Sequence, residues 1–283
     1  MKIGRQAHRS TAISSSNEET ILVRGRDLCA ELIGHIGFTD HIWLLVTGQL
    51  PGPAQRAVLD AALVAIAEHG LVPSVQASRL TLAAAPESLQ GAVAAGILGC
   101  GSVILGASEA AGRLLADVLA RADGPAVAGS TTDGSTTAGS TIDDAAAAAV
   151  SELLTDGRAV PGYGHPLHKG RDPRAERLIE LAGQVGCAGR HVDAAIAIGR
   201  VLPALSGKPL AMNISAAIPA TLLDAGYPLL ALKGVPILAR TASLVAHLLE
   251  EQERPIGFTL SHAGAAAIEY DGPSPDGFVR RDR

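Results

Sequence analysis

The chain has 283 residues, of which 47% are hydrophobic and 18% charged, a composition typical of a globular protein that excludes a disordered one. This length is enough for one large domain or for two lobes that share a core. A net charge of −5 and an aromatic content of 2% argue against a surface that binds polyanions or stacks on nucleic-acid bases.

Hydropathy and cysteine usage indicate the compartment. Mean hydropathy is +0.26, yet no uninterrupted apolar run approaches the roughly 20 residues of a membrane span. Cys29, Cys100 and Cys187 are widely spaced, so they predict neither a disulfide framework nor a zinc cluster. Residues 1–10 lack the apolar core of a secretion signal, and we therefore expect a cytoplasmic protein.

The N-terminal segment is predicted to be an entry to the fold followed by two short helices. Residues 1–20 are polar and rich in serine, and we expect them to be extended and loosely packed. A turn is predicted at Gly25, with a short helix from about Asp27. The next helix is expected to start with Thr39 as its N-cap and to end at Gly48.

A longer helix is predicted after a break at residues 51–53, because apolar residues from Leu59 to Ile66 recur at helical spacing. Gly70 is expected to end this helix, which places His69 at its C-terminus. Helix carbonyls favour a protonated imidazole there, so His69 is explained equally well as a residue that compensates the helix dipole or as a functional one.

The middle of the chain is rich in small residues. Residues 88–120 are dense in alanine and glycine, which permits close approach of helices to each other or of the backbone to a ligand. The pattern matches neither a P-loop nor a dinucleotide fingerprint. Residues 123–140 nearly repeat a glycine, serine and threonine pattern, and we interpret them as a flexible surface insertion. Helices are expected at residues 143–154 and 192–203.

Residues 161–174, P-G-Y-G-H-P-L-H-K-G-R-D-P-R, combine a glycine-rich loop with a helix start. Asp172 is expected to cap a helix that begins with Pro173, and Arg174 then lies in the first turn. A fixed cation beside free helix amides, with His165 on the preceding loop, makes a candidate anion site with a proton donor. A glycine turn before an ordinary capped helix explains the local pattern equally well.

The last third of the chain places an arginine beside an apolar stripe. Arg240 comes three residues after Ile237 and four before Leu244, so it projects at the edge of the same helical face. A guanidinium near a core face is unfavourable unless it is paired with an acid or an anionic ligand. Two ordinary explanations, in which Arg240 reaches solvent or pairs with a buried glutamate, and the functional one, in which it binds an anionic ligand, all remain open. Arg254 follows the predicted helix, where an arginine is usually exposed.

Together these motifs resemble the citrate synthase superfamily. Residues 162–174 are similar to its G-F-G-H-x-V-Y-x-x-x-D-P-R signature, with the same spacing from His165 to Arg174. Residues 24–51 resemble its N-terminal segment, and A-E-H-G at residues 67–70 resembles its first catalytic histidine motif. The short length and the close succession of these segments look like citryl-CoA lyase, including the C-terminal module of ATP-citrate lyase.

The resemblance implies an all-α fold with two lobes. The large lobe would comprise residues 1–70 and 216–283, and the small lobe residues 71–215, with the insertion near 123–140. It also implies a homodimer or higher homo-oligomer, with the site between the lobes and partly shared between subunits. A coenzyme A thioester is the implied substrate, with no metal, no tightly bound cofactor, and neither nucleic acid nor membrane as a partner.

The resemblance also implies roles for individual residues. His69 would hydrogen-bond the thioester carbonyl and stabilise the enolate of acetyl-CoA. His165 would act on the oxaloacetate carbonyl, or on the citryl hydroxyl in the cleavage direction. Arg174 and Arg240 would hold substrate carboxylates, and Arg254 would do so across a dimer interface.

Further positions are implied for the substrate and for coenzyme A. His41 stands where the family has a substrate-binding histidine. The coenzyme A arm would approach the glycine-rich region, in which the family's P-L-H-G-G is replaced here by S-V-I-L-G. The implied coenzyme A-binding residues are Gly99, Gly101, Gly106 and Lys169.

One departure from the family bears on the reaction. Ser215, in A-M-N-I-S, stands where the superfamily has its catalytic aspartate. Removing a methyl proton from a thioester needs a positioned base, whereas cleavage of citryl-CoA begins at a tertiary hydroxyl on which His165 could act. The implied activity is therefore that of a citryl-CoA lyase. A citrate or 2-methylcitrate synthase and a non-catalytic acyl-CoA- or dicarboxylate-binding homologue are the alternatives.

Overall fold

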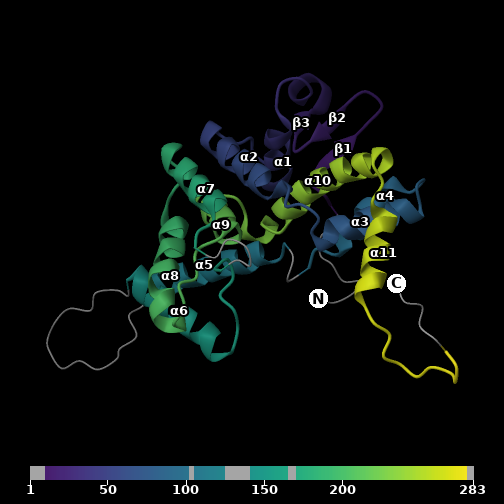
Figure 1. Ribbon diagram of the computed structural model, residues 1–283. Coiled ribbons are helices and arrows are strands. Elements are labelled where there is room, and N and C mark those ends of the chain that lie inside the picture. The colour runs from purple at the N-terminus through teal and green to yellow at the C-terminus, as the bar shows by residue number, and fades with distance from the viewer. Residues whose placement is uncertain (1–9, 102–104, 125–140, 165–169, 279–283) are drawn as a thin grey trace. The chain divides into compact units, whose positions relative to one another are not determined.

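A computed structural model describes residues 10–101, 105–124, 141–164 and 170–278 of the chain. These ranges are mostly helical, which confirms the expected all-α class (Figure 1). The chain divides into two compact units, residues 1–65 with 107–235 (unit 1) and residues 66–106 with 236–283 (unit 2). The lobes inferred from the family resemblance have other boundaries, at residues 70 and 215, and stay a prediction.

Unit 1 opens with a small antiparallel sheet, where the sequence predicted only an extended entry. The turn between its second and third strands has positive φ at Arg24 (51°) and Gly25 (79°), which confirms the turn predicted there. Asp27 caps the short π-type helix that follows by accepting hydrogen bonds from the amides of Cys29 and Ala30. The bounds of these elements are β1 Ser14–Ser16, β2 Ile21–Val23, β3 Arg26–Asp27 and η1 Leu28–Leu32.

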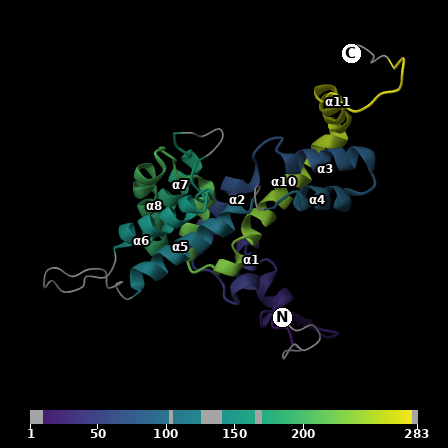
Figure 2. The same ribbon diagram turned by 90° about the horizontal axis from the view of Figure 1, so that it is seen from below.

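The rest of unit 1 is helical and shares an apolar core. Its elements are α1 Phe38–Thr47, α2 Pro53–Ala67 (its last two residues fall in unit 2), α5 Ala107–Asp123, α6 Ile142–Thr155, α7 Pro173–Gln184, α8 Arg190–Ser206, α9 Ile214–Asp224 and η2 Leu229–Ala231. Figures 1 and 2 show α5, α6 and α8 side by side, and α9 packs against α5, α7 and α8. Buried alanines such as Ala149 and Ala197 allow these helices to approach closely.

The regular elements of unit 2 are all helices within the described residues. Its elements are α3 Pro73–Ala84, α4 Leu89–Leu98, α10 Gly234–Glu253, whose first two residues fall in unit 1, and α11 Gly257–Ala267. The helix α3 packs along α4, as Figure 2 shows, and against α11. A Cβ on Gly96 would lie 2.6 Å from Cδ1 of Leu244 and 2.8 Å from the Ser74 carbonyl oxygen. The small residues of this region therefore permit the close helix packing that was predicted.

Helix boundaries follow the sequence signals with two exceptions. The predicted end of α2 at Gly70 is wrong, because the helix ends at Ala67. Glu68 accepts a hydrogen bond from the Gly70 amide in a separate turn, so His69 lies beyond the helix.

Thr39 lies inside α1 and does not cap it; Gly37 does, because its amide donates a hydrogen bond to the Asp40 carboxylate. The end of α1 is confirmed, since Gly48 follows it in the left-handed region with φ of 80°. The predicted insertion lies outside the described residues from position 125 onward.

One stretch of the described chain, Leu229–Glu253, is long and apolar enough to cross a membrane by length and composition alone. Core helices of soluble proteins pass the same test, so this is weak evidence. The buried residues of the stretch include the apolar Leu244 and Leu248, but also the charged Arg240 and Glu251. Buried charges on α10 are those of a helix that packs inside a protein.

Candidate active site

In unit 1, the loop that leads into residues 165–169 is fixed against the segment that leads into α9. The Gly164 amide donates to the Ala211 carbonyl at 2.8 Å, and the Asn213 side-chain amide donates to the Gly164 carbonyl at 2.6 Å. Asn213 also caps α9 by accepting a hydrogen bond from the amide of Ser215. The structure therefore brings the glycine-rich motif and Ser215 into one region.

The first glycine of this motif is required by its surroundings. Gly162 has φ of +85°, and a Cβ there would clash with Ala216 in the first turn of α9. His165 and Lys169 lie outside the described residues, so their predicted roles stay predictions.

Arg174 is held at the start of α7 by the residue that caps the helix. Asp172, which is 1% exposed, accepts hydrogen bonds from Nε of Arg174 at 3.0 Å, from Nη2 at 2.9 Å, and from the Ile214 amide at 3.0 Å. Burial works to raise the pKa of Asp172, but these donors outweigh it and keep the pKa below its usual value. Asp172 is therefore a charged group that fixes Arg174, a role that its spacing could have suggested.

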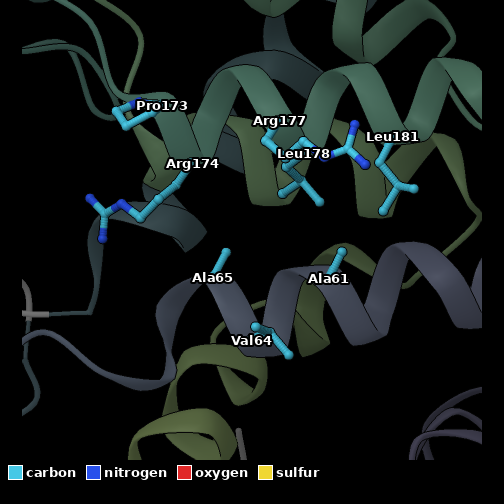
Figure 3. Close-up of a pocket in the computed structure, with 8 residues that line it drawn as sticks. All are labelled: Ala61, Val64, Ala65, Pro173, Arg174, Arg177, Leu178 and Leu181. Carbon is cyan, nitrogen blue, oxygen red and sulfur yellow. The ribbon is translucent and has the colours of Figure 1, made fainter.

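A groove of about 390 Å³ lies beside Arg174, between α2 and α7 of unit 1. Figure 3 shows Ala61 and Ala65 of α2 facing Leu178 and Leu181 of α7. The walls of this groove are apolar, and the fixed guanidinium of Arg174 stands beside them. Such a groove suits a ligand that has both an anionic and an apolar part.

His41 lies on α1 in another part of unit 1. Its neighbour Asp40 is buried and forms an ion pair with Arg56 of α2. Within the described residues, no hydrogen bond or ion pair joins His41 to Arg174 or to Ser215. The structure therefore does not bring His41 together with the other candidates by direct contact, and its role stays a prediction.

His69 belongs to unit 2 and lies two residues beyond the end of α2. The carboxylate of the preceding residue, Glu68, accepts hydrogen bonds from the Gly70 amide and the Ser243 hydroxyl and lies 3.0 Å from Nε2 of His247. These contacts attach the turn that carries His69 to α10. Glu68 was not singled out from the sequence, although it precedes the histidine of the family motif.

Arg240 lies on α10 in unit 2 and is 2% exposed. Its Nε and Nη1 atoms have no hydrogen-bond partner among the described residues. Neither of the ordinary explanations, snorkelling to solvent or pairing with a buried glutamate, therefore holds within these residues. A buried cation without a partner is strongly unfavourable. An anionic ligand is the alternative that agrees with this environment.

Arg254 follows α10 and has an exposed side chain, as predicted, with 77% of its surface accessible. Its Nη2 lies 2.9 Å from Glu250, and its carbonyl accepts a hydrogen bond from Arg79 at 3.1 Å. The backbone of Arg254 is thus fixed while its guanidinium faces outward.

The glycines expected to contact coenzyme A also belong to unit 2, near the C-terminal end of α4 or soon after it: Gly99, Gly101 and Gly106.

The sequence of residues 51–257 matches the family profile described as "Citrate synthase, C-terminal domain". The chain belongs to the citrate synthase family. No curated protein sequence matches it. Family membership agrees with the mostly helical fold and with the motifs around Arg174 and His69.

Solved structures of this family are similar to the chain over most of its length. Citryl-CoA lyase from Hydrogenobacter thermophilus is 29% identical, with a TM-score of 0.80 over 95% of this chain and 97% of that one. ATP citrate lyase from Methanosaeta concilii, solved with (3S)-citryl-CoA, is 21% identical, with a TM-score of 0.74 over 95% of this chain and 43% of that one. Citrate synthase from Thermoplasma acidophilum is 16% identical, with a TM-score of 0.63 over 87% of this chain and 59% of that one. The last two share the fold alone.

Proposed function

We propose that this member of the citrate synthase family cleaves citryl-CoA, or a close 3-hydroxy-3-carboxyacyl-CoA, into an acyl-CoA and a 2-oxo acid. The observation that carries the proposal is the buried guanidinium of Arg240, which has unpartnered donor atoms within the described residues. Arg174, fixed by Asp172, offers a second preorganised cation in unit 1. Two such cations suit a substrate that carries several carboxylates.

Two observations favour cleavage over synthesis. The 29% identity to a citryl-CoA lyase extends over 97% of that chain, whereas the compared citrate synthase is 16% identical and is covered over 59% of its length. Ser215 also stands where the family has its catalytic aspartate. A synthase with serine there would lack a strong base for the methyl group of the thioester.

In the proposed reaction, His165 takes the proton of the citryl hydroxyl. The oxygen's electron pair forms the carbonyl of the 2-oxo acid as the C–C bond breaks, and the bond's electrons pass to the thioester as an enolate. His69 hydrogen-bonds the thioester oxygen, and a water held by Ser215 protonates the enolate carbon. The hydroxide that remains is neutralised, through solvent, by the proton that His165 accepted. Arg174 and Arg240 hold carboxylates throughout, and their positive charges oppose the negative charge of the substrate.

The proposal includes the assembly and the coenzyme A contacts. We propose a cytoplasmic homodimer or larger homo-oligomer in which Arg254 contacts the substrate of another subunit. His41 is proposed as a further substrate contact. Coenzyme A takes part as the thioester substrate, and we propose no tightly bound cofactor. The described residues hold no cluster of three or more metal-ligating side chains. The proposed contacts of the coenzyme A arm are Gly99, Gly101, Gly106 and Lys169.

The direct test supplies purified protein with citryl-CoA and couples the released oxaloacetate to NADH oxidation by malate dehydrogenase. We expect release well above the spontaneous background, and loss of that release in His165→Ala and Arg240→Met. Background rates in the wild-type protein would contradict the lyase. Release of free thiol from acetyl-CoA and oxaloacetate would support the synthase instead.

A non-catalytic acyl-CoA- or dicarboxylate-binding homologue is the second candidate, because Ser215 leaves the position of the catalytic base without a carboxylate. Calorimetric binding of CoA esters without either activity would support it. Restoring the carboxylate in Ser215→Asp is expected to raise synthase activity, and Ser215→Asn is the matched control without a base. Equal activity in these two variants would show that position 215 is not the position of the base.

A further inference from the structure

Two buried polar side chains of unit 2, Ser74 on α3 and Arg240 on α10, have atoms without a standard hydrogen-bond partner among the described residues. Ser74 is 0% and Arg240 is 2% exposed. Within the described residues, Oγ of Ser74 and Nε and Nη1 of Arg240 make no hydrogen bond of standard geometry. The group that interacts with the Ser74 hydroxyl is the Cys100 thiol, a weak partner whose own hydrogen goes to the Gly96 carbonyl. Folded proteins pair the great majority of buried polar atoms. Two such side chains in one compact unit therefore point to a missing ligand.

The C-terminal end of α4 brings both side chains into one region. Burial raises the pKa of the Cys100 thiol, whereas the nearby Arg240 guanidinium and Ser74 hydroxyl oppose that rise. One turn earlier, Gly96 packs against the Ser74 carbonyl and against Leu244, which lies one turn after Arg240 on α10. Ser74 and Arg240 thus border the same buried part of unit 2.

Ser74 also stands where a helix begins. It follows Pro73 at the start of the 12-residue α3, and the N-cap residue Val72 makes no side-chain hydrogen bond to the helix. The amides of Ser74 and Val75 lie in the first turn, where they have no acceptor within the helix and where the dipole favours a negative charge. Both residues are 0% exposed, so these donors face a site that is shielded from solvent.

We propose that Ser74 binds the substrate directly, and that its hydroxyl, the first-turn amides of α3 and the Arg240 guanidinium form one oxyanion subsite within unit 2. The identity of the ligand rests on the proposed function: it is a carboxylate of the citryl group, or of the 2-oxo acid that cleavage yields. All of these groups donate hydrogen bonds, and one carries a full positive charge. The subsite therefore takes an anion.

A carboxylate suits this subsite better than the neutral oxygen of a thioester. The full charge of a buried guanidinium needs a full opposite charge, because a dipole alone offsets little of the desolvation penalty. A carboxylate has two oxygens, so one can accept from the guanidinium while the other accepts from the hydroxyl and the helix amides.

The test compares Ser74→Ala with Ser78→Ala in the full chain. Ser78 is the matched control, because it is equally buried on α3 but its hydroxyl donates to the Ala92 carbonyl at 2.8 Å. Calorimetry would measure the Kd values of citrate, oxaloacetate and acetyl-CoA. We expect Ser74→Ala to raise the Kd of citrate and oxaloacetate about tenfold or more, as for one hydrogen bond to a charged group, without a lower urea midpoint. Ser78→Ala should lower the midpoint and leave both Kd values unchanged.

Each other outcome has a distinct meaning. If Ser74→Ala leaves citrate binding unchanged and Arg240→Met abolishes it, the role of Ser74 is overturned and the proposed function stands. If Ser74→Ala weakens only acetyl-CoA binding, the ligand is the thioester oxygen and the carboxylate assignment is overturned. Ser74-dependent binding of citrate without turnover of citryl-CoA supports the subsite and contradicts the lyase. Wild-type protein that binds none of the three ligands contradicts both proposals.

Discussion

The two halves of α3 each border a buried serine and a buried arginine, and these pairs are in opposite states. In the second half, Ser78 donates to a backbone carbonyl, and the buried Arg79 lies 2.6 Å from Glu251. At the first turn, Ser74 is equally buried but has no standard partner within the described residues, and Arg240, as buried as Arg79, has unpartnered donor atoms there as well. Unit 2 therefore compensates a buried charge from its own residues at one end of α3 and leaves the other end to a ligand.

The compensated end is also closely packed. Glu251 accepts hydrogen bonds from the amides of Ile256 at 3.1 Å and Gly257 at 2.8 Å, in addition to its contact with Arg79. A Cβ on Gly257 would lie 2.5 Å from Cβ of Ala83 and 2.9 Å from the Arg79 carbonyl oxygen. Arg79 and Glu251 at this end both have partners, so we expect them to stabilise the fold. The donors at the first turn have no standard partner among the described residues, and we propose that they bind the ligand.

The largest expected effect is the difference in the free energy of unfolding between variants of Arg79 and of Arg240. Arg79→Met leaves Glu251 buried without its cation, and we expect a loss of about 3–5 kcal/mol in the free energy of unfolding. Arg240→Met removes a cation whose Nε and Nη1 atoms have no partner among the described residues, so we expect no loss of stability or a gain. Urea unfolding followed by circular dichroism measures both. Equal losses in the two variants would show that the protein does compensate Arg240.

Gly96→Ala sharpens the comparison at the packing contact near Ser74. The new methyl group would meet Cδ1 of Leu244 at 2.6 Å and the Ser74 carbonyl oxygen at 2.8 Å. We expect a loss of about 1–3 kcal/mol in stability and weaker citrate binding, since α3 must shift. The control is Gly264→Ala on α11, where a Cβ meets nothing within 4 Å. A wild-type Tm in Gly96→Ala would contradict the close packing of α4.

The difference in the free energy of unfolding between variants of Ser74 and of Ser78 should be smaller than that between the arginine variants. Ser78→Ala removes the donor to the Ala92 carbonyl, and we expect a loss of about 1 kcal/mol in the free energy of unfolding. Ser74→Ala removes a hydroxyl without a standard partner in the described residues, so its stability without ligand should match or exceed that of the wild type. A loss in Ser74→Ala as large as in Ser78→Ala would mean that the hydroxyl is paired in solution.

Acidic pH should reduce the stability that the pair of Arg79 and Glu251 contributes at the second half of α3. Burial works to raise the pKa of Glu251, but the amides of Ile256 and Gly257 and the Arg79 guanidinium keep it below its usual value. A depressed pKa in the folded state adds stability that is complete above the unfolded-state pKa of about 4.3 and is lost as pH falls through the folded value. The free energy of unfolding below this pH should therefore fall less steeply in Glu251→Gln than in the wild type. Equal slopes would contradict the depressed pKa, and Ser74→Ala is the control with an unchanged slope.

The sequence by itself determined the local features and the family. The cap of α7 at Asp172, the end of α1 at Gly48 and the turn at Gly25 all depend on residues within a few positions, and each is present in the structure. The family could be identified for the same reason, because its motif around His165 and Arg174 is contiguous. The N-cap predicted at Thr39 is wrong. The Asp40 carboxylate accepts a hydrogen bond from the Gly37 amide, so the helix starts at Phe38 with Gly37 as its N-cap.

Only the tertiary structure decided which polar groups are satisfied. From the sequence, Ser74 and Ser78 are two serines four residues apart, and for Arg240 the ordinary explanations and a ligand were equally open. Arg79 and Glu251 are 172 residues apart, and no local pattern reports that they meet. Burial and pairing arise from segments that are distant in the chain, and the energy of a buried charge depends on such neighbours and not on its own sequence context.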